Sequence, residues 1–426
     1  MMKLHWINHA SFIVDTQDTR LLCDPWFEGR AFNDSWALLA PTCIDDASLS
    51  QVTHLWFSHE HPDHFNLPTL KRLPAAFKER VQVFFQTTLD QRVVAALRKL
   101  GFAKVQELDQ QPVALGAGVS LLGPPFLHGD SWSLVRGPDA SLLNLNDCNT
   151  NRQTLDVIAA QCGPIDVLVT QFSYAAWAGN KGDEVAHRDA AAAVVDRLVE
   201  QCEVLRPRYV VLAASFVWFC HPDNFHMNAH ANRIGDVVRS VRERCAAQAI
   251  VLYPGDTWVV GAEHDPGPAI QRYQSDQDRV AEHALTPARH VPEAELLAHG
   301  RDFLRRLIKH NRTLRLFLLA PTRIQVSDLG KHFILHPLRG FVEVPSGDKI
   351  PDVELGSDAL DFAFRFGWGG ETLIVSGRYV VPKGGNFARF HEYFNIAADN
   401  NRGHRFPGLL KTMLRTAARL FRGAPH

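Results

Sequence analysis

The feature that most constrains this sequence is a short loop crowded with metal-binding side chains. In THLWFSHEHPDHFN, residues 53–66, an apolar and aromatic run ends just before His59. Within six positions the loop holds His59, His61, Asp63 and His64. A His-rich surface loop seldom combines these residue types with this spacing at the end of a predicted buried strand. We therefore predict a metal centre.

The spacing within the loop predicts two neighbouring metal ions. His59 and His61 are two residues apart, so an extended backbone directs both imidazoles to the same side. Pro62 disfavours a helix here, and Asp63 and His64 can face a second position. One loop can therefore give two ligands to each ion. Imidazole combined with carboxylate suits iron or zinc.

The rest of the chain predicts α/β layers followed by a smaller region. Predicted strands such as VQVFFQ, IDVLVTQFS and RYVVLAAS alternate with helices, and polar residues follow several strand ends, where α/β scaffolds build their sites. The composition shifts near residue 262. We predict a catalytic domain over residues 1–262, and a helical linker with a small α+β accessory domain over residues 263–426.

Several segments resemble one known family. HEHPDH matches the HxHxDH signature of the metallo-β-lactamase superfamily, and WINHASFIVD and LLCDPW are similar to its opening strands. The resemblance implies an αββα sandwich with a one- or two-metal site. It also implies a third histidine, His128 in PPFLHGD, and a bridging aspartate, Asp147 in LLNLNDCN. The superfamily's last histidine has no counterpart in RYVVLAAS. One of His221, His226 and His230 is expected to complete the second ion's ligands, with His221 preferred, or this site departs from the hydrolytic ligand set, which favours an oxygenase.

A narrower resemblance is to the CMP-N-acetylneuraminate hydroxylases, through DPWFEGRAFNDSW, LNDCN and ASFVWFCHPDNF. The first of these segments mixes aromatic residues with one arginine. Trp26, Phe27 and Trp36 are candidate substrate contacts, and Arg30 is a candidate catalytic residue that grips a polar or anionic group. For Trp26 and Trp36, packing of the loop onto the sandwich is an equal alternative.

Three further residues are candidates for supporting roles. His9 and Asp24 are expected to hold ligand imidazoles in place. AHRDAAAAV, around His187, looks like an active-site helix start of the phospholipase D that hydrolyses N-acyl-phosphatidylethanolamine, which makes His187 a candidate catalytic residue. The alternative for His187 is a partly exposed histidine at a helix start.

These observations favour a non-haem di-iron oxygenase that acts on a small polar metabolite. A dizinc hydrolase of an ester, phosphoester or amide is the alternative, and a non-catalytic metal- or ligand-binding module is the second. Two metal ions are expected, with iron favoured over zinc or manganese. No Cys-x-His and Cys-x-x-His pair for a Rieske cluster occurs in the sequence, so the oxygenase would need a separate electron donor.

Composition limits the partners and the cellular compartment that we expect. A formal net charge of −1 gives no reason to expect nucleic acid as a partner. We expect no signal peptide and no transmembrane segment, and the scattered cysteines suggest a reducing cytoplasm.

The accessory region carries no catalytic constellation. LDFAFRFGW and ETLIVSGRYVV alternate like strands, and FPGLLKTMLRTAARLFRG predicts a basic amphipathic helix. Its expected role is dimerisation or a cap over the active site.

Overall fold

The computed structural model describes residues 1–311 and 313–406, without the side chain of His128. They form two compact units. Unit 1 comprises residues 1–178, 183–220 and 225–285, and unit 2 comprises residues 179–182, 221–224 and the described residues from 286 onward. The predicted boundary at residue 262 stays a prediction.

Unit 1 is built on two mixed sheets. In spatial order, the first contains β16 (Thr257–Val259), β1 (Lys3–Asn8), β2 (Ser11–Thr16), β3 (Thr19–Cys23), β5 (His54–Trp56), β6 (Gln82–Gln86) and β7 (Lys104–Leu108). The second contains β15 (Gln248–Ile250), β13 (Tyr209–Ala213), β12 (Val167–Gln171), β11 (Ser141–Asn146), β10 (Ser133–Arg136), β9 (Val119–Leu122) and β8 (Val113–Gly116). A separate ribbon pairs β14 (Val217–Phe219) with β4 (Trp36–Leu38).

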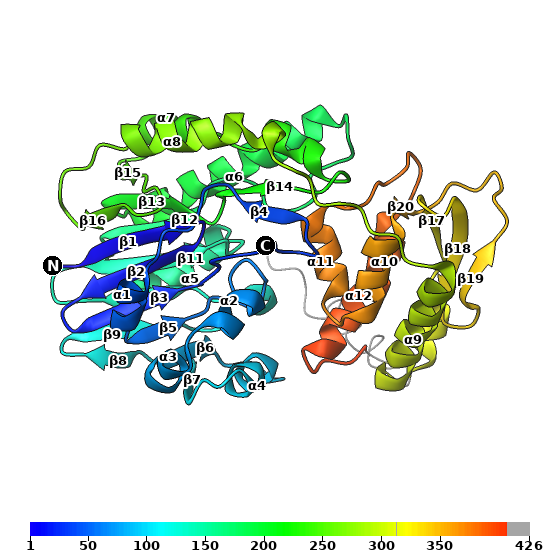
Figure 1. Cartoon of the computed structure of the whole chain (residues 1–426), viewed down its shortest axis with the longest axis horizontal. Coiled ribbons are helices and arrows are strands. Elements are labelled where there is room, and N and C mark those ends of the chain that lie inside the picture. Colours follow the sequence, from blue (N-terminus) through cyan, green and yellow to red (C-terminus); the bar gives the residue numbers. More distant parts are fainter. Residues whose placement is uncertain (312, 407–426) are drawn as a thin grey trace, which may run out of the picture. The chain divides into compact units, whose positions relative to one another are not determined.

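Helices cover the outer sides of these sheets. They are α1 (Asp46–Gln51), α2 (Leu67–Arg72), α3 (Ala75–Arg80), α4 (Arg92–Lys99), α5 (Arg152–Cys162), α6 (Glu184–Leu205), α7 (Ile234–Arg244) and α8 (Gly267–Asp278), with short 3-10 turns η1 (Leu127–Gly129), η2 (Phe225–His230) and η3 (Val280–Glu282). In Figure 1, α7 and α8 run along one side of the sheets, and α2, α3 and α4 lie on the other. The predicted αββα sandwich is confirmed.

Alternation along the strands explains this layering. In β2, Phe12 and Val14 belong to the larger core, which also contains residues of the second sheet. Ile13, between them, belongs to a second core shared with α2, α3 and α4. Successive side chains of a strand point to opposite faces. The first sheet is therefore buried on both faces, which explains its nearly continuous apolar strands.

The polar residues of interest lie at the carboxyl ends of parallel strands. β3, β5 and β6 are mutually parallel in the first sheet, and β11, β12 and β13 are mutually parallel in the second. Loops that leave these ends in both sheets can therefore meet at one edge of the sandwich.

Unit 2 combines helices with a four-stranded sheet, which confirms the predicted α+β character of the C-terminal region. Its helices are α9 (Glu293–Asn311), η4 (Leu314–Leu318), α10 (Ser357–Arg365), α11 (Gly369–Ser376) and α12 (Phe387–Asn401). Its sheet has the order β19 (Gly340–Val344), β18 (Lys331–His336), β17 (Thr322–Val326) and β20 (Val353–Leu355).

Two predicted strands of this region are wrong. LDFAFRFGW lies largely in α10, and most of ETLIVSG lies in α11. In α10 the buried apolar side chains include Leu360, Ala363 and Phe364, which follow helical spacing. The predicted tail helix lies outside the described residues.

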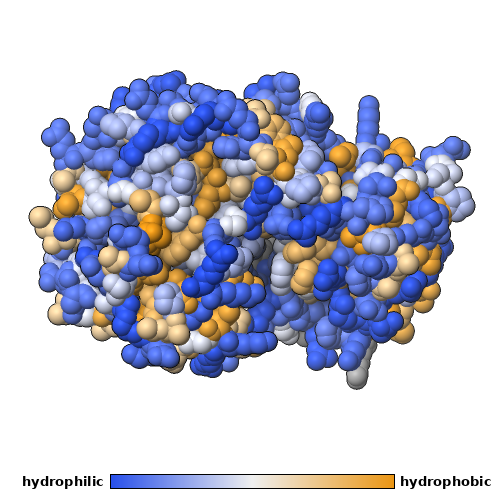
Figure 2. Space-filling view, viewed as in Figure 1, coloured by the Kyte–Doolittle hydropathy of each residue, from blue (hydrophilic) through white to orange (hydrophobic). Residues whose placement is uncertain are grey.

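None of the described helices combines the length and the apolar character that a membrane crossing requires. The face of the protein in Figure 2 is covered mainly by hydrophilic side chains, with hydrophobic residues in small groups.

Candidate metal centre

The metal-binding loop is shaped by its own hydrogen bonds. The backbone N–H of His64 donates to the carbonyl of His61 over 3.0 Å. The Asn66 amide donates to the carbonyl of Pro62 over 2.9 Å and accepts from the N–H of Thr69 over 3.0 Å, which also caps α2. The turn is therefore fixed at both ends, and its side chains are held in place before any ligand binds.

The structure brings six metal-binding side chains together in two groups. Within each group, one ligand atom per residue lies within 4.8 Å of the others. The first group is His59, His61 and Asp147, and the second group is His9, Asp63 and His64.

The first group joins the loop after β5 to the loop after β11. His59 Nε2 lies 2.9 Å from His61 Nδ1 and 3.7 Å from Asp147 Oδ2. Two imidazole nitrogens and a carboxylate oxygen converge here, which is the donor set of many zinc and iron sites. His128 lies in η1, and its side chain is outside the described part of the chain, so its predicted role as a further ligand stays a prediction.

The second group adds a residue from the turn between β1 and β2. Asp63 Oδ2 lies 3.4 Å from His9 Nε2 and 3.4 Å from His64 Nε2. Asp147 Oδ2 lies 3.7 Å from His64 Nε2, the same distance as from His59 of the first group. Asp147 therefore stands between the two groups, where one carboxylate can serve two cations.

Unpaired buried atoms support a metal rather than a polar network. Among the described residues, His64 Nε2, Asp63 Oδ1, Asp147 Oδ1 and both ring nitrogens of His9 are buried without a hydrogen-bond partner. Leaving such atoms unpaired costs roughly 1–3 kcal/mol each. Cations bound by those of these atoms that face the two groups would remove part of that cost, so the residues present fit a two-ion centre.

Asp24, at the end of β3, orients the second group. Its Oδ2 lies 2.9 Å from His64 Nδ1 and accepts from Ser58 Oγ over 2.8 Å, and its Oδ1 accepts from the Ser58 N–H over 2.8 Å. With Nδ1 engaged by the carboxylate, His64 presents Nε2 to Asp63 and Asp147. A carboxylate behind a ligand imidazole is usual in metal sites. The role predicted for Asp24 stays a prediction with this geometry in its favour.

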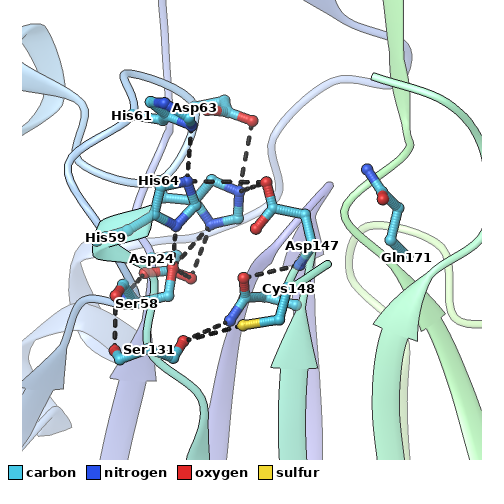
Figure 3. A network of polar contacts seen from close by, with 12 residues as sticks. Asp24, Ser58, His59, His61, Asp63, His64, Ser131, Asp147, Cys148 and Gln171 are labelled. Carbon is cyan, nitrogen blue, oxygen red and sulfur yellow. Dashed lines mark hydrogen bonds and ion pairs between the residues drawn. The ribbon is translucent and has the colours of Figure 1, made fainter. Parts of the chain in front are cut away.

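A second set of bonds ties the loops of the two sheets together. Ser131 Oγ donates to the carbonyl of Ser58 over 2.6 Å, and the Asn146 amide donates to the carbonyl of Ser131 over 3.0 Å. Asn146 also accepts from the Asp147 N–H over 2.7 Å. Figure 3 shows Ser58 and Ser131 joined by a dashed line beneath the histidines. We did not predict Ser58, Ser131 or Asn146 from the sequence, because small polar residues at strand ends carry no distinctive pattern.

The charges of the centre are arranged for cations. Burial lowers the pKa of His9 and His59 below the usual range of histidine, so both are neutral and able to coordinate. Burial alone would lower the pKa of His64 too, but Asp63 and then Asp147 raise it well above the usual range. Burial alone would raise the pKa of Asp63, but His64 and His9 hold it well below the usual range. Asp63 is thus ionised at neutral pH.

His9 occupies the region where β13 lacks a histidine. β13 ends at Ala213, and the N–H of Ala214 donates to the carbonyl of His9 over 2.8 Å. We expected His9 to support a ligand imidazole, whereas its ring lies among the donor atoms of the second group. The ligand signal was not visible in sequence, because His9 lies about fifty residues before the loop it meets.

Three predicted histidines lie outside both groups. His221 is buried, and its Nδ1 lies 3.1 Å from Asp223 Oδ2. His226 packs against His187, with ring centroids 5.5 Å apart, and His187 is buried on α6 rather than partly exposed. Neither His221 nor His226 belongs to a ligand group among the described residues, and their predicted roles, like that of His187, stay predictions.

The aromatic loop after β3 packs beside the centre. Trp26 is buried against the His9 ring, and Trp36 is buried between Phe32 and Phe219. These contacts favour the packing alternative for both tryptophans. The ring of Phe32 in turn contacts His61, with centroids 5.6 Å apart.

The other two predicted residues of this loop are less deeply buried. Phe27 is half-buried. Arg30 Nη2 donates to the carbonyl of Ala284 over 3.5 Å. The roles predicted for Phe27 and Arg30 stay predictions.

Residues 3–211 match a family model described as "Beta-lactamase superfamily domain". A mycobacterial relative, "Putative Rieske 2Fe-2S iron-sulfur protein" of Mycobacterium tuberculosis (strain CDC 1551 / Oshkosh), is 28% identical over 248 residues, which are 53% of this chain and 46% of the relative. The chain thus spans about half the length of this relative.

A second relative and a solved structure extend the comparison. "Cytidine monophosphate-N-acetylneuraminic acid hydroxylase" of Pongo pygmaeus is 36% identical over 73 residues, 17% of this chain and 12% of the relative, which confirms the resemblance seen in the sequence. The match to the structure of a possible metal-dependent hydrolase from Veillonella parvula DSM 2008 includes 61% of this chain and 98% of the hydrolase chain, with a TM-score of 0.44 and 14% sequence identity.

Proposed function

We propose that this chain, which over residues 3–211 matches a family model described as "Beta-lactamase superfamily domain", is a binuclear metal-dependent enzyme. The observation that carries the proposal is the pair of ligand groups with Asp147 between them. Six nitrogen and oxygen donors around two adjacent positions, several of them buried without partners, have no evident purpose in a structural core. The two ions would supply either activation of dioxygen or a Lewis acid with an activated water.

Of the two chemistries, we favour a non-haem di-iron oxygenase that acts on a small polar metabolite. The donor set contains imidazole and carboxylate and no thiolate, which suits iron and zinc alike, so the preference for iron rests on the relatives. The two sequence relatives support this choice, since one is named a Rieske iron–sulfur protein and the other a hydroxylase. The proposal includes an electron donor for the two ions, in keeping with the relative that is named an iron–sulfur protein.

A dizinc hydrolase is the second candidate, and His9 is the observation that favours it. The missing histidine on β13 first suggested a departure from hydrolytic ligand sets. His9 gives the second group an imidazole in its place, so the set remains one that zinc hydrolases can use. The sequence-based reason for an oxygenase is therefore weaker, and the relatives are its main support.

The deciding experiment combines metal identity with oxygen dependence. Protein purified from iron-replete cells is analysed for its metals, and dioxygen consumption is followed with a chemical reductant and a panel of small polar metabolites. The proposal expects about two iron ions per chain and consumption coupled to product. Equal turnover of the zinc form under strict anaerobiosis would replace the oxygenase with the hydrolase. Activity that survives chelation would remove both.

A further inference from the structure

A partly buried arginine lies beside the metal centre with only neutral partners. Arg197, on α6, donates through Nη1 to Asn149 Oδ1 over 2.6 Å and through Nη2 to Gln171 Oε1 over 3.1 Å. Asn149 follows Asp147 by two residues, and Gln171 is the last residue of β12. Arg197 therefore lies across the carboxyl ends of β11 and β12, on the edge of the sheet that also carries Asp147.

Arg197 lacks a carboxylate partner. Within the described part of the chain, no aspartate or glutamate oxygen lies within ion-pair distance of its guanidinium. Arg378 of unit 2, which is also buried, lies 3.3 Å from Asp223 and 2.9 Å from Asp358. A partly buried cation usually has a carboxylate partner, because its desolvation is otherwise uncompensated. Burial accordingly lowers the pKa of Arg197, although the nearby Asp147 opposes that change.

The position of Gln171 shows which way this pair faces. In Figure 3, Gln171 and Asp147 extend beyond the ends of neighbouring strands toward the same side. Gln171 accepts from Arg197 through Oε1, so its Nε2 group is turned away from that bond as a further donor. The carboxyl edge of parallel strands is the usual ligand edge of an α/β fold.

We infer that Arg197 and Gln171 bind an oxyanion of the substrate, a carboxylate or a phosphate, next to the two ions. The guanidinium has further N–H donors beyond the two bonds to Asn149 and Gln171, and its planar fork matches either group. Substrate binding would then supply the missing negative charge. This inference rests on the proposed function in taking the bound anion to be part of the substrate.

The test is anion binding by the full chain, measured by calorimetry with inorganic phosphate and, separately, with oxalate. Wild type is compared with Arg197→Met, in both metal-loaded and metal-stripped protein, because an anion also binds the ions themselves. We expect Arg197→Met to weaken the preferred anion by about tenfold or more in both forms. If phosphate binds more tightly than oxalate, the substrate group is a phosphate, and if oxalate binds more tightly, it is a carboxylate.

A matched control and two further variants keep the test decisive. Arg188 is on the same helix, exposed and paired with Glu184 over 3.3 Å, so Arg188→Gln should leave the anion affinity unchanged. Arg197→Lys keeps the charge without the fork and should lose less affinity than Arg197→Met. If Arg197→Met does not fold, Arg197→Lys and Gln171→Met carry the test, and both should weaken binding.

Wild-type affinity in a folded variant at position 197 that retains its metals would overturn the inference, as would an equal loss in Arg188→Gln. These outcomes are separable from the fate of the proposed function. If anion binding depends on Arg197 but the protein shows no turnover, the anion site is supported and the proposed enzymatic function is contradicted. If Arg197→Met turns over substrate with an unchanged KM, the enzymatic function is supported and the anion site is contradicted.

Discussion

The two ligand groups of the centre differ in how deeply they are held. In the second group, the side chains of His9, Asp63 and His64 are at most 4% exposed, and Asp24 clamps His64 from behind. In the first group, the Asp147 side chain is 20% exposed and His61 is half-buried. A buried site with pre-oriented ligands retains its ion. A more accessible site exchanges its ion more readily and can be reached by substrate. We therefore expect the second group to bind the tighter ion and the first to face the reaction.

Replacing Asp147 should have the largest effect, because its Oδ2 lies 3.7 Å from an imidazole of each group. In Asp147→Ala, both ions should bind weakly, with metal content below one ion per chain after dialysis and no turnover. Asp156→Ala is the control, since Asp156 is an exposed residue of α5 paired with Arg152. Two retained ions in Asp147→Ala would show that the groups do not share this carboxylate.

Single-ligand variants should separate the groups. Asp63→Ala should lose the second-group ion and keep the first, and His59→Ala should do the reverse. Both should reduce turnover to near background, because each leaves one ion. Elemental analysis with activity assays checks this pattern. Full activity in both variants would contradict a metal-dependent reaction at this site.

Loss of the Asp24 carboxylate, which orients His64, should weaken metal binding only at the second group. In Asp24→Asn, the fold keeps a residue of the same size, but the carboxylate that orients His64 is lost. We expect the affinity of the second-group ion to fall by about 10- to 100-fold, with the first-group ion almost unchanged. Competition with a chelator measures both ions, and equal weakening of the two would break the proposed asymmetry.

The smallest expected difference between the two groups is in how their metal affinity depends on pH. Asp63 and Asp147 raise the pKa of His64, so a cation entering the second group must displace a proton even at neutral pH. His59 has a lowered pKa and is already neutral there. As pH falls through the neutral range, affinity should therefore decline first at the second group. Calorimetry in buffers of different ionisation enthalpy should detect proton release for that ion.

The sequence predicted the local part of the centre and, through the family resemblance, Asp147, but it did not predict that His9 joins the second group. His59, His61, Asp63 and His64 were recognisable because four donors lie within six residues after a strand. The ligand position of His9 depends on the pairing of β1 with β2 and on the contact of His9 with Ala214, which no local pattern encodes.

In the second unit, LDFAFRFGW alternates as a strand would, yet it lies largely in a helix. The segment satisfies both periods, because Leu360, Ala363 and Phe364 also share one helical face. Packing of α10 against α9 decides the outcome, and that contact joins residues far apart in the chain.

The most direct test of a two-ion centre completed by His9 is the metal content of His9→Ala. His5→Ala is the matched control, since His5 lies on β1, four residues before His9, and contacts Asp15 and Thr257 away from both groups. After dialysis, wild type and His5→Ala should each hold about two ions per chain, and His9→Ala should hold about one. Two tightly bound ions in a folded His9→Ala protein would contradict the account.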